Sequence, residues 1–194
     1  MLKTTLFLTM LFASVQAFAV TAAEPTLASA EALLEQGREA DAITQLKQLL
    51  KSKPANYQAW FLLGVTEAGQ RRFHDAIASF RQVISLQPKL AEPHNNLAVI
   101  YNELGDFRAA VQELEASLQL KPDYVTAQEN IGDLYVKLAA DAYRQALDKA
   151  DNAALRQRYK RLLRIRFDDS AQPEAVDATT VAVPDVATES TEQA

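Results

Sequence analysis

The fold is decided by residues 88–122, which read PKLAEPHNNLAVIYNELGDFRAAVQELEASLQLKP. Pro54, Pro88 and Pro122 lie 34 residues apart, and much of the chain between them repeats in step. The positions that share a phase are Gly37, Arg71 and Gly105; Ala42, Ala76 and Ala110; Leu46, Phe80 and Leu114; Leu63, Leu97 and Ile131; and Gly64, Ala98 and Gly132. A fixed period of this length is typical of stacked structural repeats, in which each unit buries its apolar face only against its neighbours.

The segments between the turns have the periodicity of half-buried helices. Residues 40–51 place Ala42, Ile43, Leu46, Leu49 and Leu50 on one face, which is the spacing of an amphipathic helix. The same pattern predicts helices over residues 57–69, 73–86, 92–104 and 107–120, after a weaker helix over 28–36. Connections of a few residues force neighbouring helices to be antiparallel. The chain is therefore predicted to be all-α.

Two units carry a family signature. Its residues are Trp60, Leu63, Gly64, Ala76, Phe80 and Pro88 in one unit, and Leu97, Ala98, Tyr101, Gly105, Ala110, Leu114 and Pro122 in the next. This pattern resembles the tetratricopeptide repeat (TPR) family over roughly residues 23–141, and the exported bacterial type is expected. The resemblance implies a right-handed α-solenoid of antiparallel helix pairs: about three units, a degenerate fourth and a C-terminal capping helix. The expected repeat domain is residues 24–167.

The terminal units depart from the signature. In the first unit, Thr26 and Ser29 stand where Trp and Leu are expected, as is common for a terminal repeat with one solvent-facing side. In the fourth unit, residues 138–147 (LAADAYRQAL) contain no helix breaker. Either Ala and Asp make a turn there, or one helix runs over residues 125–149. The absence of a breaker favours the long helix.

The N-terminus reads as a secretory signal peptide over residues 1–19. Lys3 precedes the apolar run LFLTMLFASV over residues 6–15, and Ala17-Phe18-Ala19 fits a small-x-small cleavage site. The alternatives are a buried first helix or a membrane anchor, but an anchor needs about 20 apolar residues. The chain has no cysteine, which excludes a lipoprotein anchor on that residue. We expect an exported, periplasmic protein cleaved near Ala19.

The C-terminal third contains a basic amphipathic helix and an acidic tail. Over residues 152–167 the apolar stripe is Leu155, Tyr159, Leu162, Leu163 and Phe167, and the basic face is Arg156, Arg158, Lys160, Arg161, Arg164 and Arg166. We interpret this helix as a cap on the stack. Its basic face is a possible site for an anionic partner, or less favourably for a membrane surface. Residues 168–194 have acids but no Lys or Arg and few large apolar groups, so they are predicted to be disordered.

The sequence contains no catalytic or cofactor motif. The two histidines are His74 and His94, and His94 has the phase of Trp60, which indicates packing between helices. No His/Cys/Asp/Glu group has zinc spacing, no Gly-rich loop suits a phosphate, and no serine lies in a nucleophile elbow. Apart from the acidic tail the charge is nearly balanced, so no nucleic-acid partner is expected. We predict no enzyme activity, no cofactor and no metal.

In TPR arrays the first helix of each pair lines a concave groove. The resemblance therefore implies a partner-binding groove formed by Phe61, Leu62, Val65, Glu92, Asn95, Asn96, Val99, Asn102, Glu129, Asn130 and Asp133. Asn96 and Asn130 match the asparagine position of members that clamp a C-terminal carboxylate. No basic residue lies at the groove positions, so a carboxylate clamp is not expected. Phe61 is the predicted aromatic anchor, and the asparagines are equally suited to bridging neighbouring helices.

Two classes of function remain open. The leading hypothesis is a non-enzymatic scaffold that binds a peptide or protein segment in the groove, in bacterial envelope assembly or maturation. The alternative is a self-associating structural module without a peptide groove, or one whose basic C-terminal helix binds an anionic partner. The oligomeric state is not predicted.

The targeting hypothesis makes a direct prediction. Protein recovered from the envelope of an expressing bacterium should begin at or shortly after Val20, because cleavage follows the small residues at 17 and 19. Intact-mass spectrometry measures this, with a variant lacking residues 1–19 as the cytoplasmic control. Retention of Met1 in a membrane pellet would contradict cleavage.

Overall fold

The computed structural model describes residues 25–150 and 152–167, and all regular elements in these ranges are α-helices. They are α1 (Leu27–Glu35), α2 (Glu39–Ser52), α3 (Tyr57–Gly69), α4 (Phe73–Leu86), α5 (Glu92–Glu103), α6 (Phe107–Leu120), α7 (Val125–Lys149) and α8 (Ala153–Phe167). The expected all-α fold is confirmed. The signal peptide over residues 1–19 and the acidic tail over 168–194 lie outside the described residues.

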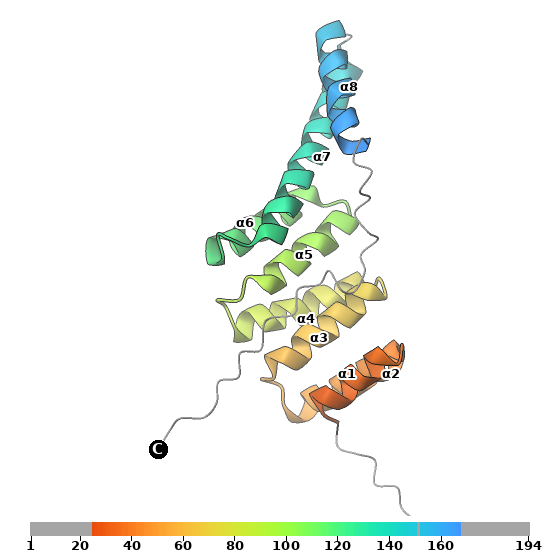
Figure 1. Ribbon diagram of the computed structural model, residues 1–194, viewed down its shortest axis with the longest axis vertical. Coiled ribbons are helices and arrows are strands. Elements are labelled where there is room, and N and C mark those ends of the chain that lie inside the picture. Colours follow the sequence, from red (N-terminus) through yellow and green to blue (C-terminus); the bar gives the residue numbers. More distant parts are fainter. Residues whose placement is uncertain (1–24, 151, 168–194) are drawn as a thin grey trace, which may run out of the picture.

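The helices stack as successive pairs. Helix α1 packs on α2, α3 on α4 and α5 on α6, and each pair contacts the next through α2–α3, α4–α5 and α6–α7. Figure 1 shows the pairs following one another along the long axis of the molecule. We call α3, α5 and α7 the inner helices, because α5 also touches both α3 and α7; α2, α4 and α6 are the outer helices. This is the predicted α-solenoid.

The connection between the two helices of a pair requires a left-handed backbone residue. Gly37 and Gly105 have φ of 70° and 77° there, and Arg71 takes the same conformation with φ of 57°. Glycine adopts this geometry without steric cost, whereas an arginine does not. The Arg71 guanidinium lies 5.1 Å from the ring centre of Phe73 and 3.3 Å from a Glu103 carboxylate oxygen. The repeat thus imposes its turn even where the sequence disfavours it.

Each helix pair buries one large side chain of its outer helix at the same repeat position. Leu46, Phe80 and Leu114 occupy the same repeat position and are fully buried. A Cβ atom on Gly64 would lie 3.1 Å from the Phe80 ring, so the absence of a side chain at Gly64 lets the ring pack directly against the α3 backbone. Trp60 is at the edge of the core: it is partly buried, and its indole N–H donates to the Pro54 carbonyl at 2.8 Å. The deepest aromatic residue is therefore Phe80, not Trp60.

A buried acid links the first two pairs. Glu67 has 1% of its surface exposed, accepts a hydrogen bond from the Ser79 hydroxyl at 2.8 Å, and lies 3.1 Å from the Lys47 ammonium. Because Ser79 is on α4 and Lys47 on α2, this one carboxylate connects three helices. Breaking such a group by removing a partner is costly, since the buried charge is left uncompensated.

The end of the stack differs from the other units. Helix α7 is continuous from Val125 to Lys149, which confirms the longer of the two alternatives. Helix α8 packs against α7 and runs back along its distal part, so the two form a hairpin that extends beyond the stack (Figure 1). None of the described helices is long and apolar enough to span a membrane.

The prediction that α8 caps the stack is correct only in part. Its residues Leu155, Tyr159, Leu162 and Leu163 are half-buried, and the side chain of Phe167 lies outside the described residues. Nearer the stack, however, Val125 is 61% and Tyr135 50% exposed. An amphipathic pattern indicates that a helix buries one face but not where along its neighbour it lies. Here α8 leaves the proximal part of α7 uncovered.

Two glycine substitutions should change stability in opposite directions. Gly105→Ala should lower the free energy of unfolding by about 1 kcal/mol, because alanine disfavours a positive φ. Gly132→Ala should raise it by about 0.5–1 kcal/mol, because Gly132 is inside a helix and no described atom lies near its would-be Cβ. Urea unfolding followed by circular dichroism measures both changes. Shifts of the same sign would show that the turn geometry is misassigned.

Candidate functional site

The candidate groove residues lie on the three inner helices α3, α5 and α7. Because α5 contacts α3 on one side and α7 on the other, the structure places these residues on one continuous row of helices. Their exposure differs greatly along that row. The side chains on α3 are mostly enclosed, whereas two on α7 are exposed.

Phe61 is not available to a partner, and its predicted role as an aromatic anchor is wrong. It is 2% exposed, and its ring packs edge-on against Phe80 with 5.6 Å between ring centres. Val65 is also buried at 8% exposure, and Leu62 packs against the core formed between α1, α2 and α3. The physical reason is that α3 has neighbours on several sides, namely α2, α4 and α5. These side chains hold the stack together.

Three of the asparagines connect α5 to α7. The Asn130 amide donates to the Asn95 side-chain oxygen at 2.9 Å, and Asn95 is 1% exposed. The Lys137 ammonium donates to the Asn102 side-chain oxygen at 2.8 Å. Both bonds span 35 residues, one repeat plus one position. Of the two roles open to these asparagines, the structure shows the bridging role.

Asn96 is buried but incompletely bonded. It is 6% exposed, and its amide nitrogen has no hydrogen-bond partner among the described residues. A buried donor without a partner costs about 1–3 kcal/mol. Asn96 therefore carries unused hydrogen-bonding capacity on the central inner helix.

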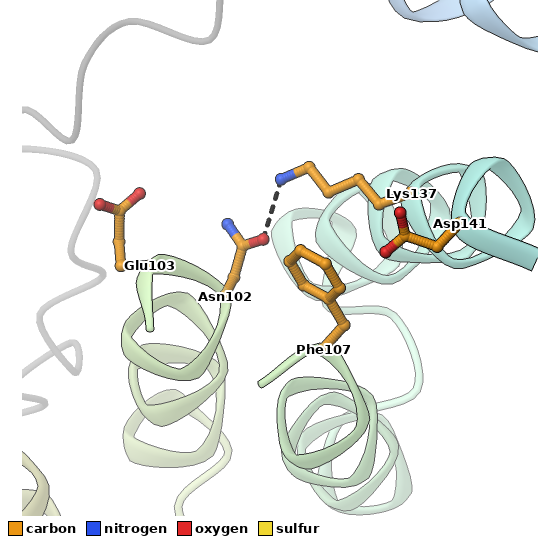
Figure 2. A pocket seen from close by; sticks show the side chains of 5 residues that line it. All are labelled: Asn102, Glu103, Phe107, Lys137 and Asp141. Atoms are coloured by element: carbon orange, nitrogen blue, oxygen red, sulfur yellow. Dashed lines mark hydrogen bonds between the residues drawn. The ribbon is translucent and has the colours of Figure 1, made fainter. Parts of the chain in front are cut away.

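A pocket lies beside the Asn102–Lys137 bridge. Figure 2 shows Asn102 and Lys137 pointing toward each other, with Phe107 and the carboxylates of Glu103 and Asp141 around them. The pocket has a volume of about 230 Å³. Glu103 is paired with Arg71 at 3.3 Å and Asp141 with Arg144 at 3.1 Å. Within the described residues, no carboxylate oxygen comes within salt-bridge distance of Lys137.

Sequence reasoning missed Lys137. The residue one repeat after Asn102 is Val136, so Lys137 lies one position beyond those that the family resemblance assigns to the groove. The available signal was its spacing of one repeat plus one residue from Asn102. The assigned groove positions carry no basic residue. The site itself does carry one, because the long side chain of Lys137 reaches in from the neighbouring position.

The α7 edge of the inner surface carries unpaired negative charge. Glu129 and Asp133 lie one turn apart, both are exposed, and neither forms an ion pair within the described part of the chain. Glu92, in contrast, lies 3.6 Å from the Lys121 ammonium. Glu92 also helps to raise the pKa of Tyr124 to about 12, although burial of that hydroxyl is the larger cause. Val99, on α5, is partly buried.

The basic face of α8 is a separate surface. Those of its members whose side chains the structure describes are all exposed: Arg156, Arg158, Lys160, Arg161 and Arg164. Figure 1 shows α8 at the far end of the molecule from α1–α4. This face therefore does not contribute to the groove along α3 and α5.

The described residues give no sign of a metal centre. They contain no group of three or more His, Cys, Asp or Glu side chains placed to hold a metal ion. His94 instead contacts Glu113 through its Nδ1 atom at 2.7 Å, which links α5 to α6. This agrees with the predicted packing role of His94.

Two family models match the chain. Those for the tetratricopeptide repeat and TPR repeat match residues 27–91 and 99–139, together more than half of the 194 residues. The helix pairs and the left-handed turns between them are the structure that these family models describe. The chain belongs to the tetratricopeptide repeat family.

Curated relatives match part of this chain. The chain is 26% identical over 115 residues to Superkiller complex protein 3 of Homo sapiens, which is 59% of this chain and 7% of that protein. It is 26% identical to the uncharacterized protein ycf37 of Guillardia theta, over 54% of this chain and 65% of that one. The chain thus spans a small part of the human relative and less than two thirds of the algal one.

Solved structures show the same fold. MamA matches with a TM-score of 0.53 and 23% identity, covering 61% of this chain and 68% of that chain. The first TPR of Spaghetti (RPAP3), bound to the HSP90 peptide SRMEEVD, matches with a TM-score of 0.55 and 16% identity, covering 58% and 89%. At these identities the likeness concerns the fold alone.

The asparagine bridge should contribute to stability. Asn130→Ala should lower the free energy of unfolding by about 1–2 kcal/mol, because the buried Asn95 oxygen loses its donor. Glu129→Ala is the matched control, since its exposed neighbouring side chain should matter by less than about 0.5 kcal/mol. Urea unfolding measures both. Equal midpoint shifts would mean that the bridge is not a structural element.

Proposed function

We propose that the chain is a non-enzymatic scaffold that holds an extended segment of a partner protein along α5 and α7. The observation that carries the proposal is the arrangement on these two helices. A lysine without a carboxylate partner lines an open pocket, and two unpaired acids lie exposed on α7. The fold supports a protein partner, because similar structures include TPR domains solved with HSP90 and HSP70 peptides.

The chemistry of the surface defines the segment. Glu129 and Asp133 favour basic side chains, and Lys137 can donate to a backbone carbonyl or to one acidic group. With Phe61 enclosed, the binding energy rests on these polar groups rather than on an aromatic anchor. We therefore expect a transient complex in which charge sets specificity.

An enzymatic role has little support. One similar structure is a Thermobaculum terrenum O-GlcNAc transferase mutant, but the likeness covers 25% of that chain. Repeats of this kind serve as surfaces for other proteins, since each unit contributes its side chains to a continuous exposed face.

The proposed setting is the bacterial envelope. The support is the sequence of residues 1–19, with its basic start, apolar run and small-x-small site. An exported scaffold of this type would act in envelope assembly or in the maturation of other envelope proteins.

A second candidate function rests on α8. Its exposed arginines form a basic face on a hairpin that extends beyond the stack. Such a face suits an anionic partner by charge complementarity. This candidate predicts a different set of sensitive residues.

The test compares the two surfaces with one probe. A fluorescent peptide selected from a random library on the folded protein should contain Lys or Arg. Glu129→Gln with Asp133→Gln should weaken its binding about tenfold, equivalent to about 1.4 kcal/mol. Arg158→Gln with Arg161→Gln changes as many charges on α8 and should alter binding less than about twofold.

Fluorescence anisotropy at several salt concentrations measures both variants. Lys137→Met is the third arm, and it should weaken binding without altering the preference for basic peptides. If only the arginine pair matters, the groove proposal is wrong and α8 carries the function.

A further inference from the structure

The proximal half of α7 is an inner helix without an outer partner. Helix α3 is covered by α4 and α5 by α6, whereas α7 continues straight to Lys149. Helix α8 packs along the distal part of α7 instead (Figure 1). We call the uncovered surface formed by Val125, Gln128, Gly132 and Tyr135 the open seat. These residues share one helix face, because they are spaced three to four positions apart.

Gly132 shows that the seat is empty within the described part of the chain. At the same repeat position, a Cβ atom on Gly64 would lie 3.1 Å from the Phe80 ring of the outer helix. A Cβ atom on Gly132 would have no described neighbour within 4 Å. Val125 and Tyr135 share this face and are 61% and 50% exposed, so two large apolar side chains are uncovered beside Gly132. Helix α7 therefore presents the surface on which a fourth outer helix would pack, but no described helix packs there.

The outer helices that pack in the complete pairs show what kind of helix would fit the open seat. Each outer helix presents a small residue followed four positions later by a large apolar one: Ala42 and Leu46, Ala76 and Phe80, and Ala110 and Leu114. All six are fully buried in their pairs. Since the open seat continues the same series of contacts, a fitting helix carries this small-then-large pattern on one face.

The charge around the seat defines the rest of that helix. Glu129 neighbours Val125 and Gly132 on α7, and Glu115 of α6 lies 3.5 Å from the Tyr135 hydroxyl on the other side. Both acids are exposed, and neither has an ion-pair partner among the described residues. A second copy docked through the same face would place these acids against their own equivalents. Charge complementarity therefore favours a basic helix from another protein.

We propose that the open seat is a second docking site, which binds a basic amphipathic helix of a partner protein in place of a fourth outer helix. It lies on a different face of α7 from the Asn102–Lys137 pocket, and Glu129 borders both surfaces. Binding that depends on Gly132 and Tyr135 but not on Lys137 belongs to the seat, so failure of the seat would leave the groove proposal standing.

The chain supplies two matched probes. Synthetic peptides of residues 72–87 (α4) and 106–121 (α6) both carry the small-then-large pattern, but their formal net charges are of opposite sign, positive for the first and negative for the second. The labelled 72–87 peptide should bind the protein, and its affinity should fall as salt is raised. The 106–121 peptide should bind about tenfold more weakly or not at all.

A blocking substitution locates the binding. Gly132→Leu places a side chain where the outer helix must approach, so it should weaken binding of the 72–87 peptide at least about tenfold. Gly69→Leu is the control, because Gly69 is also helical and has open space around its would-be Cβ. Tyr135→Ala is a second seat variant, and circular dichroism verifies the fold of all three. The peptide that probes the groove should bind Gly132→Leu like the wild type.

Three results would overturn the proposal. The first is no binding of the 72–87 peptide at up to millimolar concentration, and the second is unchanged binding by both Gly132→Leu and Tyr135→Ala. The third is a wild-type dimer in light scattering that Gly132→Leu converts to a monomer. That result would assign the seat to a second copy of the chain.

Discussion

The structure depends on the close approach of each inner helix to its outer helix. At Gly64 the approach is limited by the Phe80 ring, which a Cβ atom would meet at 3.1 Å. Because protein interiors are close-packed, one small residue opposite one large residue sets both the distance and the crossing of the pair. The same relation between small and large residues recurs in each pair, so each pair presents the same surface to the next. The regular stack in Figure 1 follows from this local fit.

Regular stacking brings residues one repeat apart into contact across neighbouring units. Asn95 meets Asn130 and Asn102 meets Lys137, each 35 residues away, while Arg71 meets Glu103 at a separation of 32. Side chains that hold inner helices together in this way are not free to bind a partner. Helix α7 has no further inner helix to hold in the described structure. Its acids Glu129 and Asp133 therefore have no ion-pair partner among the described residues. The charged side chains available to a binding partner thus lie at this end of the molecule.

Repeat spacing was sufficient to predict the helix boundaries and the pairing, because these depend on apolar period and on helix breakers. For residues 125–149 the absence of a breaker favoured the continuous helix but left a turn open. Repeat spacing was insufficient for the depth of individual side chains. Phe61 has a position that lines the groove in related repeats, yet it fills the space beside Phe80. The burial of a side chain depends on how many helices pack around its own helix, and the repeat period of the sequence does not give that number. Lys137 was missed for another reason: its flexible stem lets the ammonium reach a site that its backbone position does not indicate.

The unusual end of the stack is specified by two residues that act in the same direction. Ala139 has the phase of Gly105, whose φ of 77° an alanine disfavours, and alanine is the best helix former. Continuing α7 is therefore favoured over turning at this point. Arg144 has the phase of Ala110, which is fully buried between paired helices. Even if the chain turned, an outer helix with Arg144 there would bury a charge without a partner, at a large cost. Ala139 and Arg144 thus each oppose a turn followed by an outer helix, and replacing one would leave the other in place. Helix α7 is therefore continuous, and its proximal face has no outer helix against it.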